Sequence, residues 1–156
     1  HFISNFAEVV KIPEPSRTKT SINELARAVE SLTRIECQCR NIKLELNLTP
    51  ETDIVSVDGI QFEQVLFNIV KNAYEAIEKD GEIYIITSST PLSISIENNG
   101  PSITEDVKQK LFTPFFSTKS TGQGIGLMFI REVLLNHKCK FDLSSDNGWT
   151  KFDIYF

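Results

Sequence analysis

The chain has 156 residues, a size that suits one domain with one hydrophobic core. An apolar fraction of 40% and a charged fraction of 24% indicate a globular chain and exclude a disordered one. The net charge of −5 and the lack of a Lys/Arg run predict that neither nucleic acid nor a membrane surface is a direct partner. No apolar run approaches the roughly 18–20 residues that cross a bilayer.

Cysteine and histidine usage does not indicate a metal centre or a nucleophile. Cys37 and Cys39 are separated by one residue on an expected helix, so they point to different faces and chelate poorly. With Cys139 the count is odd, which favours reduced thiols in a cytosolic protein over zinc. Neither His1 nor His137 lies beside a Ser, Cys or Asp arrangement for nucleophilic catalysis. Because the first residue is not Met, we expect a piece of a longer protein.

The first half of the chain predicts a linker, a helix and two strands. Residues 1–10 are typical of the end of a helix, which Pro13 and Pro15 stop, so 1–15 should be a preceding element plus linker. Residues 16–156 then form the main domain. Ser21 and Glu24 form a capping box, and the apolar spacing predicts an amphipathic helix to about Arg40. Residues 42–48 alternate as a half-buried strand, and 54–57 predict a short strand.

Residues 59–77 predict a second amphipathic helix with two asparagines on its polar side. Its apolar stripe is Phe62, Leu66, Ile69, Ala73 and Ala76 or Ile77. Asn68 and Asn72 are four residues apart and share a face. Asn is a poor residue inside a helix because it competes for backbone hydrogen bonds. Two of them on one face therefore suggest a function, whereas a merely solvated face would more usually carry Glu and Lys.

The second half predicts two hairpins and a further helix. Residues 83–88 and 94–98 form the first hairpin, and a short helix begins near Thr104. Another helix runs from Ile125 to about Asn136, and 140–144 with 150–156 form a final hairpin. The expected fold class is α+β: a two-layer α/β sandwich with a mixed, mostly antiparallel sheet and helices on one face.

Residues 112–127 combine an aromatic cluster, a small polar segment and a glycine run. Three of the seven glycines, Gly122, Gly124 and Gly126, fall within five residues. Glycine allows the backbone to approach a ligand closely, and a helix N-terminus attracts phosphate. The stretch therefore predicts a mobile phosphate-covering loop on a hydrophobic foot. The alternative is an ordinary glycine turn before a helix.

Five motifs, in order, resemble those of bacterial sensor histidine kinases. Residues 64–73 resemble the asparagine box, 98–103 the first glycine box, 112–119 the phenylalanine box, 122–127 the second glycine box and 148–152 the closing G-x-T-x-F strand. The match extends from about Ser21 to the C-terminus. The resemblance implies the GHKL (Bergerat) ATP-binding fold, with ATP under a lid and Mg²⁺ bridging its phosphates.

The resemblance also implies roles for polar side chains at the phosphates. Asn72 would supply an oxygen to Mg²⁺, a hard cation that takes few protein ligands. Asn68 would face the phosphates and metal-bound water, where relatives that hydrolyse ATP, such as gyrase and the MutL proteins, carry a Glu. An amide cannot act as that general base, so Asn68 favours phosphoryl transfer to another acceptor. Lys71 and the catalytic lid residue Lys119 would neutralise phosphate charge, and the alternative for each is a solvated lysine.

Other positions would hold the nucleoside and cover the phosphates. The implied contacts are Asn98, Gly100, Ser102, Gly122, Gly124, Ile125, Gly126, Leu127 and Thr150. Asn98 stands where the family has Asp; its amide oxygen can still accept from the adenine amino group, without charge. Ser102 replaces a glycine at which backbone lies close to the base. Both changes allow weaker binding, or binding without turnover, and Thr150 can also be an ordinary strand residue.

The histidine that such a kinase phosphorylates has no match in the chain. His1 begins the chain, and His137 resembles the structural end of the lid helix. The resemblance implies the cytoplasmic catalytic half of a sensor kinase, whose substrate histidine lies on a helical hairpin of the same parent protein. Residues 1–10 would be the tail of that hairpin, and a response regulator would act downstream. We expect a monomeric fragment and a homodimeric parent.

Two other functions remain as alternatives to a histidine kinase. Asn98 and Ser102 allow a nucleotide-binding pseudokinase or docking module without turnover. A GHKL ATPase or serine kinase is the third possibility, and it predicts Glu in place of Asn68. Residues 112–127 should be the most mobile part of the domain without nucleotide.

Overall fold

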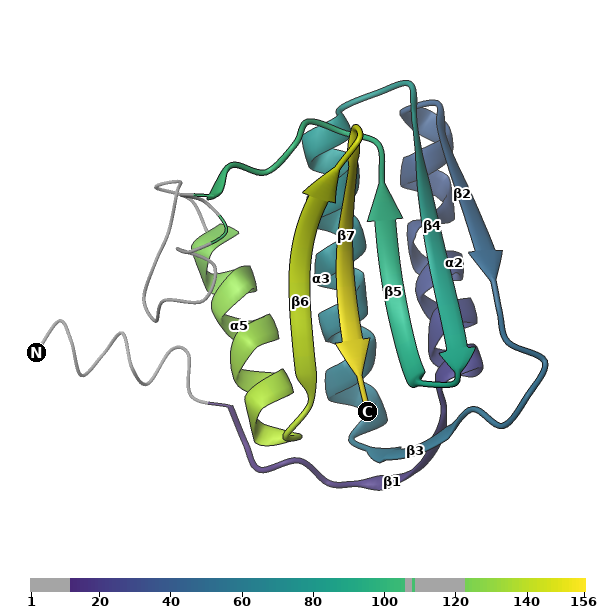
Figure 1. The fold of residues 1–156 in the computed structure, drawn as a ribbon, viewed down its shortest axis with the longest axis vertical. Helices are drawn as coiled ribbons and strands as arrows, with labels where there is room; N and C mark the ends of the chain where they lie inside the picture. The colour runs from purple at the N-terminus through teal and green to yellow at the C-terminus, as the bar shows by residue number, and fades with distance from the viewer. Residues whose placement is uncertain (1–11, 106–107, 109–122) are drawn as a thin grey trace, which may run out of the picture.

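The computed structural model describes residues 12–105, 108 and 123–156 of the chain. These residues form an α+β fold of two layers, a five-stranded sheet with helices on one face (Figure 1). The strands, in sheet order, are β2 (Ile42–Asn47), β4 (Gly81–Ser89), β5 (Leu92–Asn98), β7 (Trp149–Tyr155) and β6 (Lys140–Asp146). β2 and β4 pair in parallel and the other neighbours are antiparallel. The expected mixed, mostly antiparallel sheet is confirmed.

The helices that cover the sheet are α2 (Ile22–Cys39), α3 (Gly59–Ile77) and α5 (Gln123–Asn136). In Figure 1, α2 and α3 lie behind the sheet and α5 lies at its left, so that α3 is between α2 and α5. Ser21 caps α2, since its hydroxyl oxygen accepts the Glu24 N–H at 3.1 Å. Asp58 caps α3 in the same way through the Gln61 N–H at 3.1 Å. The helices expected from residues 21 and 59 are therefore confirmed, with the starts that their caps dictate.

A second, two-stranded sheet lies at one end of the domain. β1 (Thr18–Ser21) pairs antiparallel with β3 (Ile54–Val57), placing Thr18 opposite Val57 and Ser21 opposite Ile54. The sequence predicts β3 but not β1, whose residues are all polar and show no alternation of apolar side chains. The strand forms because β3 offers backbone partners 33 or more residues away, a contact that local pattern does not reveal.

The hydrophobic core fills the space between the helices and one face of the sheet. Its largest fully buried side chains include Phe62, Ile22, Leu66, Ile83, Ile85, Ile94, Ile130, Leu134 and Ile154. The period of two in each strand places the alternate side chains on the other face, which no described helix covers (Figure 1). There Ser95 donates a hydrogen bond to Asp153, and Lys151 lies 3.6 Å from the Asp153 carboxylate.

Ser16 and Arg17, which precede β1, form hydrogen bonds with the start of α3 and the end of α5. The Ser16 N–H donates to the Asp58 carboxylate at 2.9 Å, and Arg17 donates to the Asn136 carbonyl at 3.0 Å. The Asp58 N–H in turn donates to His137 Nε2 at 3.0 Å. Residues 16–17, the start of α3 and the end of α5 therefore form one connected cluster. Among the described residues no helix is long and apolar enough to cross a membrane.

Candidate functional site

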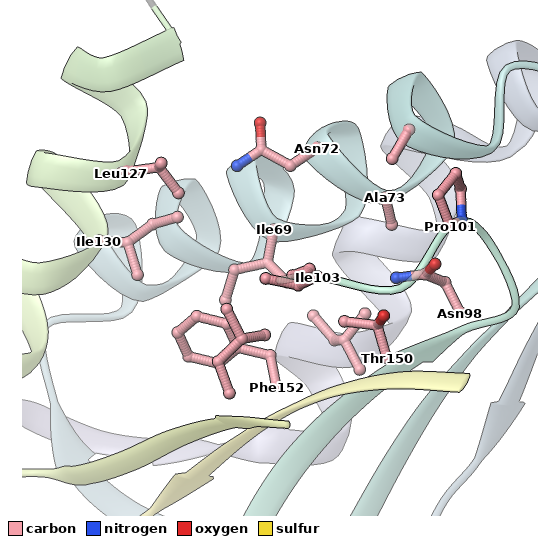
Figure 2. A pocket seen from close by; sticks show the side chains of 13 residues that line it. Ile69, Asn72, Ala73, Asn98, Pro101, Ile103, Leu127, Ile130, Thr150 and Phe152 are labelled. Carbon is pink, nitrogen blue, oxygen red and sulfur yellow. The ribbon is translucent and has the colours of Figure 1, made fainter. Parts of the chain in front are cut away.

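A cavity of about 110 Å³ lies between α3, the first turns of α5 and the strands β5, β6 and β7 (Figure 2). This volume accommodates several water molecules, so the space suits a ring system rather than one bound water. Its polar lining consists of Asn72, Asn98 and Thr150. Its apolar lining consists of Ile69, Ala73, Ala76, Ile96, Pro101, Ile103, Leu127, Ile130, Leu143 and Phe152. An apolar pocket with a few convergent polar groups is typical of a small-molecule site.

Strand register brings the polar floor of the cavity together. Asn98 on β5 is the direct partner of Thr150 on β7, and Thr150 is the partner of Ser145 on β6. All three therefore point to the helix-covered face at the same level of the sheet. The Ser145 and Thr150 hydroxyls lie 3.0 Å apart, and Ser145 Oγ also accepts the Ile103 N–H at 3.1 Å. Ser145 thus connects the loop after β5 to the final hairpin.

Asn98 lines the cavity and is 9% exposed. Its side-chain oxygen Oδ1 accepts the Gly100 N–H at 2.9 Å, so the oxygen holds the turn after β5. Figure 2 shows this oxygen on the side of Pro101 and the amide nitrogen directed into the cavity. The sequence predicts that the oxygen accepts from an adenine amino group. In the structure that oxygen has a partner within its own loop.

Gly100 and Ser102, both expected at the nucleotide, lie outside the cavity lining. A Cβ on Gly100 would meet Ile77 Cγ1 at 2.9 Å and Asn98 Oδ1 at 3.0 Å. Glycine is therefore required here by the packing of the loop against the end of α3. Ser102 is exposed, and its side chain does not line the cavity.

Helix α3 carries the polar residues expected at the phosphates, and some of them line the cavity. Asn72 is half-buried and lines the cavity, whereas Asn68, one turn earlier, is half-buried but lies outside the lining. Lys71 is exposed and forms an ion pair with Glu75 at 3.8 Å. The described residues contain no group of three or more His, Cys, Asp or Glu side chains that could enclose a metal. At the cavity wall, the polar side chain that α3 contributes is that of Asn72.

The lid prediction falls partly outside the described residues. The phenylalanine box 112–119, with Lys119, and Gly122 lie there, as do residues 1–10 of the expected hairpin tail. Gly124, Ile125 and Gly126 belong to the first turn of α5, where they form regular helix. Leu127, the next residue, is half-buried and lines the cavity.

Sequence reasoning missed the apolar walls of the cavity and the supporting Ser145. Ile69 and Ala73 belong to the stripe that predicts the core side of α3, and Ile96 belongs to the inward side of β5. Core and pocket wall share one face of each element, so period alone does not separate them. No signal marked Ser145, because its role depends on which strand lies opposite β7.

Comparison of the sequence with known families and proteins identifies relatives. The family of histidine kinase-, DNA gyrase B- and HSP90-like ATPases matches residues 57–156. Sensor protein FixL of Bradyrhizobium diazoefficiens is 29% identical over 140 residues, which cover 86% of this chain and 28% of FixL. Sensory histidine kinase/phosphatase NtrB of Escherichia coli O157:H7 is 31% identical over 153 residues, which cover 90% of this chain and 44% of NtrB. The chain thus spans about a quarter to less than half of these relatives.

Solved structures resemble the fold closely. A nucleotide-free form of the catalytic domain of histidine kinase ThkA has a TM-score of 0.81 at 32% identity, covering 90% of this chain and 95% of that one. ThkA in complex with response regulator protein TrrA has a TM-score of 0.77 at 29% identity, covering 99% of this chain and 45% of that one. The chain belongs to the histidine kinase-, DNA gyrase B- and HSP90-like ATPase family, and it has the fold of the catalytic domain of sensor histidine kinases.

Proposed function

We propose that this chain binds Mg-ATP and transfers the γ-phosphoryl group to a histidine on a separate domain of its parent protein. The observation that carries the proposal is the convergence of four of the five motifs on one cavity. Asn72 from α3, Asn98 from β5, Leu127 from α5 and Thr150 from β7 all line it, although they come from distant parts of the chain. The nucleoside would lie between α3 and the sheet, with its phosphates directed toward the start of α5.

The residues present fit a magnesium ion better than an all-protein metal cage. Mg²⁺ keeps several waters and takes one or two protein oxygens together with substrate phosphates. The Asn72 side-chain oxygen, half-buried at the cavity wall, can be such a ligand, and Asn68 can hydrogen-bond a bound water or phosphate from one turn away. When bound, Mg²⁺ would neutralise charge on the phosphates.

Transfer to an imidazole suits this site better than hydrolysis. The attacking ring nitrogen forms a bond to the γ-phosphorus while the bond to the β,γ-bridging oxygen breaks, and ADP leaves. Catalysis of this step needs mainly positioning and charge neutralisation. Hydrolysis needs a base to take a proton from water, and the Asn68 amide cannot do so. Lys119 remains a proposed phosphate contact, with Lys71 as a second cation on α3.

The substrate and downstream partner are proposed from the relatives. FixL is a sensor protein, NtrB is a sensory histidine kinase/phosphatase, and ThkA forms a complex with a response regulator. We therefore propose a phosphoacceptor hairpin in the same parent protein, a response regulator as the next acceptor, and a cytoplasmic position for this domain in a homodimeric parent.

The test is Mg-dependent ATP binding by the chain, followed by phosphate transfer from labelled ATP to a histidine hairpin from the same parent. Asn72→Ala should remove most of the magnesium dependence, because the side-chain oxygen is lost. Gln64→Ala is the matched control, because it removes an exposed amide from the same helix. It should change neither ATP binding nor its magnesium dependence. Unchanged metal dependence in Asn72→Ala would contradict the metal role, and steady ATP hydrolysis by the chain alone would favour an ATPase.

A second candidate is a nucleotide-binding module without turnover. It is favoured by Asn98, whose oxygen holds the loop at Gly100 and which lacks the charge of the family's Asp. This candidate predicts calorimetric binding of Mg-ATP with no phosphate transfer when the hairpin is supplied. A folded chain that shows no binding heat with millimolar Mg-ATP would leave only a docking role.

A further inference from the structure

We propose that Ile77 is a positioning residue for the cavity that binds the nucleotide. A strained turn centred on Glu78 holds the Ile77 side chain against the loop that follows β5, and this contact sets the gap between that loop and the end of α3. The inference rests on the proposed nucleotide site. Ile77 itself does not line the cavity and lies outside the five sequence motifs.

The Ile77 side chain occupies space that two glycines leave open. A Cβ on Gly81, the first residue of β4, would lie 2.5 Å from Ile77 Cγ2, and a Cβ on Gly100 would lie 2.9 Å from Ile77 Cγ1. Non-bonded carbon atoms do not approach so closely. The γ carbons of Ile also cannot turn away freely, because a β-branched side chain is restricted at χ1. Ile77, the last residue of α3, therefore lies between the start of β4 and the loop after β5.

The neighbours of these contacts line the cavity. Ala76 precedes Ile77 and belongs to the lining, as do Asn98 and Pro101 on either side of Gly100. Figure 2 shows Asn98 and Pro101 on the same side of the cavity. Because Gly100 meets Ile77 without a side chain of its own, a shift of Ile77 changes the separation between α3 and this loop directly. That separation is the width of the cavity between the two.

Glu78, which follows α3, has a backbone conformation that is rare for residues with a side chain. Its φ is 70° and its ψ is −62°, and the Lys79 N–H donates to the Ile77 carbonyl at 2.9 Å. These dihedrals and this hydrogen bond define a strained γ-turn, which glycine adopts more readily. Glu78 is exposed, so its side chain gains no burial that would offset the strain. Strained backbone of this kind is concentrated at functional sites.

Contacts with the end of α2 hold the turn in place. The Arg40 guanidinium donates to the Tyr74 carbonyl at 3.3 Å and to the Glu78 carbonyl at 3.4 Å, and it lies 4.9 Å from the centre of the Tyr74 ring. The Arg40 carbonyl accepts the Asp80 N–H at 2.9 Å. Strained backbone persists only where the surrounding structure fixes it in this way. The turn therefore leads the chain into β4 while Ile77 stays in contact with both glycines.

Replacement of Glu78 separates a positioning role from a purely structural one. Glu78→Gly relieves the strain, so the thermal midpoint measured by scanning calorimetry should rise by about 2–4 °C. The freed turn lets Ile77 shift, so the dissociation constant of Mg-ADP, measured by titration calorimetry on the 156-residue chain, should rise about fivefold. Loss of a negative charge cannot explain weaker binding of an anion. A stabilised chain that binds its nucleotide more weakly is the signature of strain retained for function.

Three further variants complete the experiment. Glu78→Gln removes the same charge and keeps the turn, so both quantities should match the wild type. Lys138→Gly is the matched backbone control, because Lys138 follows α5, is exposed and has a φ of 58°, but does not adjoin the cavity lining. It should not change the dissociation constant. Ile77→Ala removes the contact with both glycines, so it should weaken Mg-ADP binding at least as much as Glu78→Gly while lowering the midpoint.

The outcomes distinguish the inference from the proposed function. An unchanged dissociation constant in Glu78→Gly or in Ile77→Ala overturns the inference and leaves the proposed function standing. A midpoint that does not rise in Glu78→Gly also overturns it, because the turn would then hold no strain. Equal weakening in Lys138→Gly would do the same, since that residue lies away from the cavity. A folded wild-type chain that does not bind Mg-ADP contradicts the proposed function itself.

Discussion

At the scale of single residues, Ser145 supports two residues of the cavity wall without lining the cavity itself. Its oxygen accepts the Ile103 N–H, and its hydroxyl contacts that of Thr150. Ile103 and Thr150 both line the cavity. A single hydroxyl therefore sets the distance between the loop after β5 and the floor of the pocket.

We predict that Ser145→Ala weakens both stability and nucleotide binding. The Ile103 N–H loses its acceptor, which should lower the free energy of unfolding by about 1–2 kcal/mol in urea titrations. Thr150 loses its fixed partner, so nucleotide affinity measured by calorimetry should fall several-fold. Ser144→Ala is the control, because Ser144 points to the open face of the sheet. Equal effects of the two variants would show that the hydroxyl has no positioning role.

The three thiols differ in environment more than their spacing suggests. Cys37 is 1% exposed, and burial raises its pKa to about 11; the neighbouring Glu36 carboxylate acts in the same direction. Burial also raises the pKa of Cys139 to about 11. Cys39 is exposed at the end of α2. Cys37 is thus a core residue of α2, in keeping with the reduced thiols favoured by the sequence.

At the scale of elements, His137 connects the end of α5 to the start of α3. Its Nδ1 lies 2.8 Å from the Val133 carbonyl, and its Nε2 accepts the Asp58 N–H, so the neutral ring carries its proton on Nδ1. Burial lowers the pKa of His137, and the Arg17 charge lowers it further, while the Val133 carbonyl and Asp58 oppose the shift. A second proton on Nε2 would face the Asp58 N–H. The cluster therefore favours neutral His137.

We predict that the domain loses stability as pH falls below about 6.5, the ordinary pKa of histidine. Because the pKa of folded His137 is lower than that of the unfolded chain, its contribution is complete above that pH. The contribution is lost as pH falls from there through the folded pKa. The slope should not exceed about 1.4 kcal/mol per pH unit for one proton.

Urea midpoints measured between pH 5 and 8 test this dependence. His137→Gln should flatten the profile, whereas His1→Gln, which removes the other histidine, should retain it. The carboxyl of Asp58 titrates elsewhere, because the Ser16 N–H holds its pKa below the usual range. A slope that survives in His137→Gln would assign the effect to other groups.

At the scale of the whole molecule, the cavity lies between the two layers, with α3 and α5 on one side and β5, β6 and β7 on the other. Its lining comes from α3, α5, the loop after β5 and three strands. A ligand there would contact both the helix layer and the sheet, which unfolding separates. Binding should therefore stabilise the fold as one unit.

We predict that Mg-ADP raises the thermal midpoint of the chain. At a ligand concentration about one hundred times the dissociation constant, the gain is about 2.7 kcal/mol, which corresponds to about 5–10 °C for a domain of this size. Differential scanning calorimetry with Mg²⁺ and with EDTA separates the metal-dependent part. Asn72→Ala should reduce that part and Gln64→Ala should not. A midpoint that does not change with nucleotide would contradict binding at this site.

Much of the architecture follows from local sequence. Ser21 and Asp58 mark the helix starts because the side chain of each accepts a hydrogen bond from the backbone N–H three residues later. Alternation along β5 places Asn98 on the buried face, together with Ile94 and Ile96. These features depend on residues close in the chain, and sequence reasoning can reach them.

Other features depend on partners far away in the chain. β1 exists because β3 pairs with it, and Ser145 supports Thr150 because β6 lies beside β7. The walls of the cavity repeat the pattern of the core, so Ile69 and Ala73 gave no separate sign of a pocket. Gly100 is required by Ile77, a residue from another element.

The sequence by itself determined the family, most of the elements and the motif residues that could meet a nucleotide. Helix caps, periodicity and short motifs each depend on a few neighbouring residues. They can therefore be predicted without a structure. Only the tertiary structure decided which of those residues share a cavity and which way the Asn98 amide faces. That direction is set by one backbone N–H in a folded turn, and a hydrogen bond has a polarity that a residue name does not specify.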